Sequence, residues 1–251
     1  MIAWEIVERA EQPGGGELVL ARRGQEWAVR AGGRVLMTSR VHGSEEALAA
    51  LALERAAQAR AVLLGGLGMG FTLRATLDRL PGDARVIVAE LSPALVAWNR
   101  GPLADLAGRP LEDSRVRLQV GDAAARIREA RGAWDVILLD VDNGPEAVAR
   151  PANAGLYGNP GIRACRDALR GGGVLAVWSA GPDAAYQARL ERAGLSAEVR
   201  TVTARGEAGG VRHTVFLASK PASRPNQPRP APARRAGPAP RGGVRRRPGR
   251  G

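Results

Sequence analysis

Two carboxylates and an amide follow an apolar stretch in the second half of the chain. The run Val136–Leu139 leads into Asp140, and Asp142 and Asn143 come directly behind it. A carboxylate at such a place can hold a substrate ammonium group, accept a proton from an attacking amine and stabilise the charge that arises during the attack. The alternative is structural, with Asp140 capping a turn and Asp142 opening an ordinary β-turn. We favour chemistry on an amine, with Asp140 and Asp142 as catalytic residues and Asn143 beside the substrate.

A glycine-rich turn lies upstream, between the apolar run Val62–Leu64 and a helix expected from Thr72. Glycine lets the backbone approach a ligand closely, and the helix N-terminus adds a partial positive charge. Tight packing of a strand on a helix can demand the same residues, so the turn alone is weak evidence. The glycines that we assign to a cofactor site are Gly65, Gly66, Gly68 and Gly70.

Acidic residues follow the next two predicted strands. Glu90 comes after Arg85–Ala89, about twenty residues beyond the glycine turn, where a carboxylate can accept both hydroxyls of a ribose. Asp122 comes after Val116–Val120, in a position suited to the amino group of adenine, although a helix cap explains it nearly as well. The ordered series of glycine turn, Glu90 and Asp122 predicts a nucleoside site at the carboxyl ends of the strands.

The elements that must position these residues alternate between apolar strands and helical stretches from residue 61 onward. Such alternation predicts an α/β fold, a doubly wound, mostly parallel Rossmann-like sheet of the S-adenosylmethionine methyltransferase type. A nicotinamide enzyme shares the glycine turn and the ribose acid, but it needs a pyrophosphate site and usually a second domain, for which this chain is short. The predicted strands are Ala61–Leu64, Arg85–Ala89, Val116–Val120, Trp134–Leu139, Gly173–Trp178 and His213–Ala218.

The first part of the chain has a different pattern. Short β-like runs separated by glycines predict a small antiparallel meander over residues 1–43. Ser44 is expected to N-cap a helix that ends at about Arg60 and to open a cofactor-binding catalytic domain over residues 44–219. The runs of the meander are Glu17–Ala21, Trp27–Arg30 and Arg34–Thr38.

The net charge of +12 is concentrated in residues 220–251. This segment holds ten basic residues, no acidic residue and eight of the 17 prolines, which leaves a net charge of +2 for the rest. Because it can bury no core, we expect a disordered tail. The tail could hold nucleic acid by counterion release, but no aromatic residue interrupts its arginines, so we favour a solvated extension.

Cysteine usage and hydropathy indicate a cytoplasmic protein. Cys165 is the single cysteine, which excludes an internal disulfide framework and fits a reducing compartment. It lies in a run typical of a helix, Ile162–Leu169, where we expect a packed and inert thiol. No apolar stretch approaches the ~20 residues of a membrane span, and the N-terminus lacks the pattern of a secretory signal, so we expect no membrane partner.

Residues 17 to 219 resemble the spermidine synthases, the polyamine aminopropyltransferases. The resemblance is carried by the small N-terminal β portion and by residues at the ends of four successive strands, namely Gly65–Gly70, Glu90, Gly121-Asp122 and Asp140. It implies a transferase in which Glu90 binds the ribose, Asp122 contacts the adenine and Asp140 is the general base. It also implies decarboxylated S-adenosylmethionine as co-substrate, no metal and a small-molecule amine as acceptor.

Two further segments extend the resemblance. Ser44-Glu45-Glu46 lies where the family has Tyr-Gln/His-Glu, and Asn153–Tyr157 resembles the segment after the acidic loop. The resemblance therefore implies that Glu46 and Tyr157 contact the substrate, together with Asn143.

The sequence also departs from the family pattern. Gly68 stands where the family usually has an aspartate among its glycines, Ser44 replaces the tyrosine, and the acidic loop is shortened to Asp140–Pro145. The aspartate would hold the aminopropyl ammonium group, so its absence keeps intact S-adenosylmethionine and methyl transfer as an alternative. A non-catalytic cofactor- or RNA-binding module is a second alternative, and a homodimer is left open.

Overall fold

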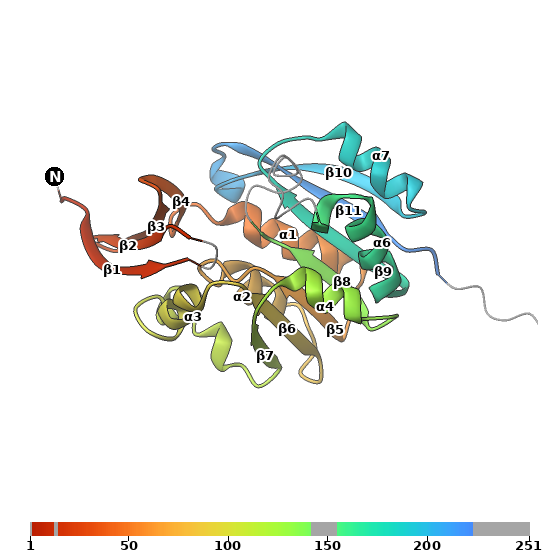
Figure 1. Ribbon diagram of the computed structural model, residues 1–251, viewed down its shortest axis with the longest axis horizontal. Helices are drawn as coiled ribbons and strands as arrows, with labels where there is room; N and C mark the ends of the chain where they lie inside the picture. Colours follow the sequence, from red (N-terminus) through yellow and green to blue (C-terminus); the bar gives the residue numbers. More distant parts are fainter. Residues whose placement is uncertain (1, 13–14, 142–154, 223–251) are drawn as a thin grey trace, which may run out of the picture.

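The computed structural model describes residues 2–12, 15–141 and 155–222, and it contains two sheets. A small sheet formed by the N-terminal residues stands at one end of a larger α/β body (Figure 1). Asp142, Asn143 and residues 223–251 of the basic tail lie outside the described residues, so the predictions made for them stay predictions.

The small sheet is an antiparallel meander of four strands in the order β1-β2-β3-β4. Three of these strands confirm the predicted runs, and β1 is an additional one. Leu18, Leu20 and Val29 of this sheet are buried in one cluster with Met69 and Trp98 of the larger body, so apolar packing docks the two parts together. The strands are β1 (Glu5–Glu11), β2 (Glu17–Arg23), β3 (Glu26–Ala31) and β4 (Arg34–Thr38).

The large sheet has seven strands in the order β10-β11-β9-β8-β5-β6-β7. The five strands from β5 to β9 run parallel, and β11 joins them antiparallel to both β9 and β10. This confirms the predicted doubly wound, mostly parallel sheet; β10 is a strand that the sequence pattern did not predict. The strands are β5 (Ala61–Gly65), β6 (Arg85–Glu90), β7 (Val116–Val120), β8 (Trp134–Leu139), β9 (Leu169–Ser179), β10 (Ser196–Thr203) and β11 (Arg212–Ser219).

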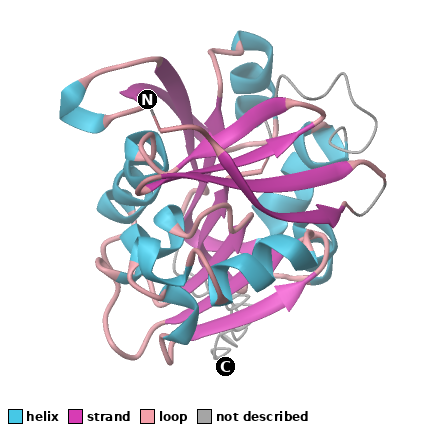
Figure 2. Cartoon of the chain, turned by 90° about the vertical axis from the view of Figure 1, so that its left-hand side faces the viewer, coloured by secondary structure: helices cyan, strands magenta, loops and turns pink. Residues whose placement is uncertain are grey.

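Helices cover both faces of this sheet (Figure 2). Val62 and Leu64 of β5 are buried with residues of α1 and α2 on one face, whereas Leu63 is buried with residues of α4, α6 and α7 on the other. The alternation follows from the two-residue period of a strand. None of the helices within the described residues is long and apolar enough to cross a membrane. The helices are α1 (Gly43–Arg55), α2 (Phe71–Leu77), α3 (Pro93–Arg100), α4 (Ala123–Glu129), α6 (Asn159–Ala168) and α7 (Ala184–Arg192).

The predicted cap and end of the first helix were wrong. Helix α1 begins at Gly43 with His42 as its N-cap residue, and it ends at Arg55 rather than near Arg60. Ser44 lies inside the first turn and is buried. Trp178 Nε1 donates a hydrogen bond to its hydroxyl oxygen at 3.1 Å, and a second hydrogen bond of 2.9 Å joins the hydroxyl to His213 Nδ1. The serine hydroxyl therefore ties α1 to β9 and β11 instead of capping its own helix.

Cys165 is buried in α6, as predicted. Burial raises the pKa of its thiol to about 12. Because the thiolate is the reactive form, this cysteine is an inert part of the core at neutral pH.

Candidate active site

The glycine turn fits against the end of β8, the strand that leads to Asp140. The backbone N–H of Asp140 donates to Gly65 O at 2.9 Å, and Gly66 has φ +91°. A Cβ on Gly66 would lie only 2.2 Å from the carbonyl oxygen of Asp140. Only glycine allows this approach of two backbones, so the turn and Asp140 are held in fixed register.

Glu90 is the buried acid beneath the glycine turn. Its side chain is only 6% exposed, and its two carboxylate oxygens accept hydrogen bonds from different segments. Leu67 N donates to Oε2 at 2.8 Å and Ser92 N donates to Oε1 at 2.7 Å. Because a carboxylate oxygen can accept more than one hydrogen bond, these contacts with the turn do not exclude a contact with a ligand.

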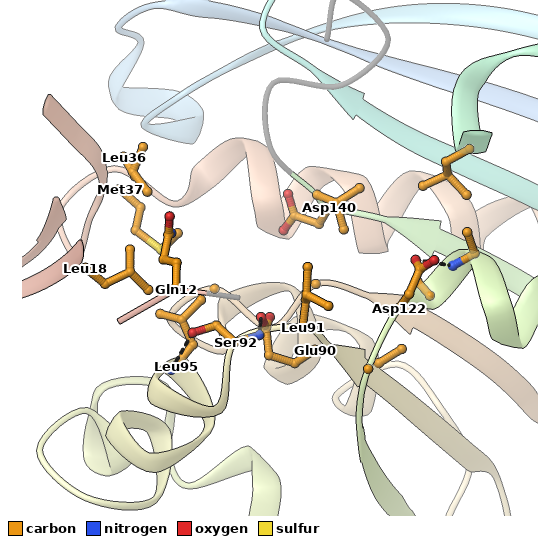
Figure 3. A pocket seen from close by; sticks show the side chains of 18 of the residues that line it. Gln12, Leu18, Leu36, Met37, Glu90, Leu91, Ser92, Leu95, Asp122 and Asp140 are labelled. Atoms are coloured by element: carbon orange, nitrogen blue, oxygen red, sulfur yellow. Dashed lines mark hydrogen bonds between the residues drawn. The ribbon is translucent and has the colours of Figure 1, made fainter. Parts of the chain in front are cut away.

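Asp140 follows β8 with its carboxylate directed into the space between the two sheets (Figure 3). The hydroxyl of Thr72, in the first turn of α2, donates to Asp140 Oδ2 at 2.5 Å. A charge-assisted hydrogen bond of this kind is short and fixes the rotamer of the acid. The side chain is thus oriented before a substrate arrives.

Asp122 N-caps α4 through Oδ1, which accepts from Ala124 N at 2.8 Å. The structural interpretation from the sequence is therefore correct. Asp122 also lines the cavity described below, so capping does not exclude contact with a ligand. Its other oxygen, Oδ2, lies 3.7 Å from the guanidinium of Arg128.

These acids surround one cavity of about 270 Å³. It runs from Asp122 past Glu90 and Asp140 to apolar side chains of the small sheet and of α3 (Figure 3). The residues around it that come from the small sheet are Gln12, Leu18, Val29, Leu36 and Met37; those from the large sheet and its helices include Gly66, Gly68, Glu90, Leu91, Ser92, Leu95, Asp122, Arg128, Asp140, Val141 and Leu156.

The structure thus brings together most of the predicted cofactor and catalytic residues. Gly66, Gly68, Glu90, Asp122 and Asp140 all line the cavity. The two remaining glycines of the motif do not line it and serve packing. Gly65 is buried in β5, and Gly70, at φ +88°, is the N-cap residue of α2.

Glu46 and Tyr157 are not among the described residues that line the cavity. The Glu46 side chain is 49% exposed and pairs with His42 Nδ1 at 2.8 Å, and it does not line the cavity. Tyr157 is fully buried, and its hydroxyl donates to the carbonyl of Val141 at 3.2 Å. The substrate contacts that the resemblance implies for these two residues stay predictions.

Sequence reasoning missed Glu45, the neighbour of Glu46. Burial and the negative charges of Asp140 and Glu46 raise the pKa of Glu45 well above its usual range. Within the part of the chain that the structure describes, no Lys, Arg or His pairs with this carboxylate. One residue before Glu46 on α1, Glu45 is rotated from it by about 100° around the helix axis, so the two carboxylates leave the helix in different directions.

Sequence reasoning also missed the residues that the small sheet contributes to the wall of the cavity. Gln12 lies at the end of the β1–β2 hairpin and Met37 lies on β4, and each is more than 25 residues away from the glycine motif in sequence. No local pattern connects them with Gly68. The Sδ atom of Met37 lies 3.7 Å from where a Cβ on Gly68 would stand.

The side chains that line the cavity have a chemistry suitable for an adenosyl group. The lining combines a buried carboxylate, a second acid at the far end and apolar walls between them, which are suitable for a nucleoside without phosphates. Within residues 2–12, 15–141 and 155–222, no three His, Cys, Asp or Glu side chains gather as a metal site would require.

Comparison with known proteins agrees with this geometry. Residues 41–187 match the spermine/spermidine synthase domain. The chain belongs to this family. The matched part of this synthase domain extends from just before α1 into α7, so it contains all of the strand ends that carry the acids of the site.

Curated relatives of this synthase domain are named polyamine aminopropyltransferases. That of Nitrosomonas europaea is 35% identical over 120 residues, which are 47% of this chain and 34% of the relative. That of Mycobacterium tuberculosis is 29% identical over 170 residues, or 66% of this chain and 31% of the relative. The chain thus spans about a third of the length of these relatives.

Solved spermidine synthases share the fold. The enzyme of Thermotoga maritima superimposes with a TM-score of 0.70 at 20% identity, covering 87% of this chain and 74% of that one. A spermidine synthase in complex with the transition state analogue AdoDATO gives a TM-score of 0.72 at 18% identity, with the same coverage of both chains.

Proposed function

We propose that this protein is an aminopropyltransferase that moves an aminopropyl group from decarboxylated S-adenosylmethionine to a small amine. Family membership and the names of the curated relatives support the reaction class. Glu90 would hold the ribose and Asp122 the adenine. Asp140 would act on the amine.

The negative charges around the cavity favour decarboxylated S-adenosylmethionine over the intact form as the co-substrate. The cavity is lined by Glu90, Asp122 and Asp140, and the one cationic side chain among the described lining residues is Arg128, beside Asp122 at the nucleobase end. Intact S-adenosylmethionine carries a carboxylate beyond its sulfur, and near Asp140 that group would meet like charge. The decarboxylated form carries only positive charges there, which the acids favour.

Asp140 has the position and the orientation to serve as the base. When bound, decarboxylated S-adenosylmethionine supplies a carbon beside a positive sulfur, so that a C–N bond replaces a C–S bond and a neutral thioether leaves. The Asp140 carboxylate would attract the acceptor as an ammonium ion, and it would take the proton that the attacking nitrogen must lose. Thr72 would hold this carboxylate in place throughout, through its 2.5 Å hydrogen bond.

Methyl transfer is the second candidate because Gly68 leaves the glycine motif without an acid. Identification of the released nucleoside separates the two reactions. The purified protein would be incubated with either form of the co-substrate and a panel of aliphatic diamines. Release of methylthioadenosine supports aminopropyl transfer, and release of adenosylhomocysteine would replace it by methyl transfer. If neither is released, the protein is a binding module.

A further inference from the structure

The first turn of α1 is held between the start of α2 and the end of β9. The ring of His42, the N-cap residue of α1, stacks on Phe71 with the two ring centroids 4.0 Å apart. Phe71 is the first residue of α2 and precedes the threonine whose hydroxyl donates to Asp140. On the other side, Trp178 near the end of β9 donates to the hydroxyl of Ser44. The residue after Ser44 therefore stands at a fixed place close to the proposed base.

Glu45 is that residue, and its carboxylate has no partner of its own. Its side chain is mostly buried, and the negative charge of Asp140 acts on it. The adjacent carboxylate of Glu46 is paired with His42 Nδ1 at 2.8 Å. Within the part of the chain that the structure describes, no group donates a hydrogen bond to the Glu45 carboxylate and no cation pairs with it. Glu45 and Asp140 therefore lie near each other without a positive charge between them.

A ligand with a positive charge would suit this place. Carboxylates that lie near each other in a mostly buried site repel, and a cation that enters between them removes the repulsion. The one arginine among the described residues that line the cavity is Arg128, and it lies beside Asp122 at the other end. A substrate that carries an ammonium group would supply the missing charge.

The glycine turn contributes no acid to the same place. Gly68 has no side chain, and the nearest atom to a Cβ at this position is Met37 Sδ, at 3.7 Å. The negative charge that accompanies Asp140 therefore comes from α1. Since the nucleoside would lie between Asp122 and Asp140, the chain attached to its sulfur would leave the cavity on the side of Asp140.

We propose that Glu45 binds the ammonium group at the end of the aminopropyl chain of decarboxylated S-adenosylmethionine. Asp140 then remains available for the attacking amine, so each carboxylate serves one nitrogen. Intact S-adenosylmethionine carries a carboxylate on the carbon that bears its ammonium group, and this carboxylate would meet the like charge of Glu45. The inference rests on the proposed function, and it names the residue that selects the decarboxylated form.

Binding of two thioether nucleosides to the full chain tests this assignment. The probes are 5′-methylthioadenosine and 5′-deoxy-5′-(3-aminopropylthio)adenosine. Both have an uncharged sulfur, and only the second carries an ammonium group. Calorimetry would compare the wild type with Glu45→Gln and with the matched control Glu54→Gln, at an exposed position of the same helix, after melting curves have shown that all three are folded.

We expect Glu45→Gln to bind the aminopropyl probe about tenfold more weakly than the wild type does, equivalent to ~1.4 kcal/mol. Glutamine keeps the shape of the side chain and removes only its charge. The affinity for methylthioadenosine should not change, so the variant loses the preference of the wild type for the aminopropyl probe. Glu54→Gln should match the wild type with both probes.

Equal weakening of both probes in Glu45→Gln would make Glu45 a structural residue. Unchanged binding of both probes together with a raised KM for a diamine acceptor would move its role to the acceptor. Either result would overturn the inference and leave the proposed function standing. If the wild type binds neither probe, the nucleoside site and the proposed function fail together.

Discussion

Asp140 is constrained from two directions at the scale of single residues. Its backbone N–H donates a hydrogen bond to Gly65 O, and its carbonyl oxygen packs closely against Gly66. Its carboxylate accepts a hydrogen bond from the hydroxyl of Thr72. A base that is already oriented loses little entropy when the substrate binds, which is how positioning lowers a barrier. The charge of this residue, rather than its shape, is what the proposed chemistry uses.

Asp140→Asn keeps the shape and can still accept from Thr72, but it removes the negative charge. We expect turnover to fall roughly 10²–10⁴-fold, the usual range for a positioned acid–base group, with nearly unchanged affinity for methylthioadenosine. Steady-state kinetics and calorimetry on the same preparation measure both. Thr72→Val, which retains the charge and loses the hydrogen bond, should lose less. Turnover at the wild-type rate in Asp140→Asn would make Asp140 a turn residue.

Glu45→Gln tests the buried carboxylate whose pKa is raised by burial and by the charge of Asp140. Because the pKa of Glu45 is raised in the fold, the folded chain binds its proton more tightly than the unfolded chain does. The protonated Glu45 side chain therefore contributes to the stability of the fold. This contribution is complete at pH values below the ordinary pKa of about 4.3, and it is lost as the pH rises through the raised pKa of the folded chain. Glutamine cannot ionise, so the variant should melt above the wild type near neutral pH and equal to it near pH 4.

Melting temperatures from pH 4 to pH 8 check this expectation. Glu54→Gln, at an exposed position of the same helix, is the matched control and should show no pH-dependent difference. A variant that melts below the wild type at every pH would show that the Glu45 carboxylate stabilises the fold.

At the scale of elements, Glu90 joins the glycine turn after β5 to the start of α3. One of its oxygens holds Leu67 of the turn, and the other holds Ser92, whose own side chain N-caps α3. The acid that we propose to bind the ribose is therefore also a structural link between three elements. Substitution at this position has to be judged by stability and by binding together.

Glu90→Gln replaces one acceptor oxygen by a donor that faces a backbone N–H. One buried N–H then loses its partner, at a cost of roughly 1–3 kcal/mol of folding free energy. We expect a lower melting temperature and weaker binding of methylthioadenosine, measured by calorimetry well below the transition. Unchanged affinity in a folded variant would limit Glu90 to its structural role.

At the scale of the whole molecule, we propose that residues 44–219 form the catalytic unit, that residues 1–43 close its cavity, and that the basic tail beyond Ala222 is dispensable. The large sheet continues just past β11, because Lys220 N donates to Gly173 O and Gly172 N donates to Lys220 O. Lys220 Nζ also donates to Leu169 O at 2.6 Å. A truncation that spares these contacts must end beyond Lys220.

A chain that ends at Ala222 should keep the melting temperature and the nucleoside affinity of the full chain, because it loses no contact of the described core. Differential scanning calorimetry and titration with methylthioadenosine measure both. If the full chain binds RNA, its affinity should fall steeply with salt, and the shortened chain should not bind. A large drop in melting temperature on truncation would contradict a dispensable tail.

The sequence by itself determined the parallel sheet and the order of the acids along it. Apolar strands such as Val136–Leu139 identify themselves by composition, and each acid that follows such a strand must emerge at the same edge of the sheet. Glu90, Asp122 and Asp140 could therefore be placed at one edge of the sheet without coordinates, and all three line the cavity. Local patterns failed at Ser44, because its partners Trp178 and His213 lie more than 130 residues away.

Only the tertiary structure decided what surrounds these acids. It brought Gln12 and Met37 of the small sheet to the same cavity as the glycine turn, and it buried Glu45 within reach of the negative charge of Asp140. It also placed Arg128 beside Asp122. The physical reason is that periodicity specifies which face of an element is apolar, whereas the packing of one element on another decides which side chains share a cavity.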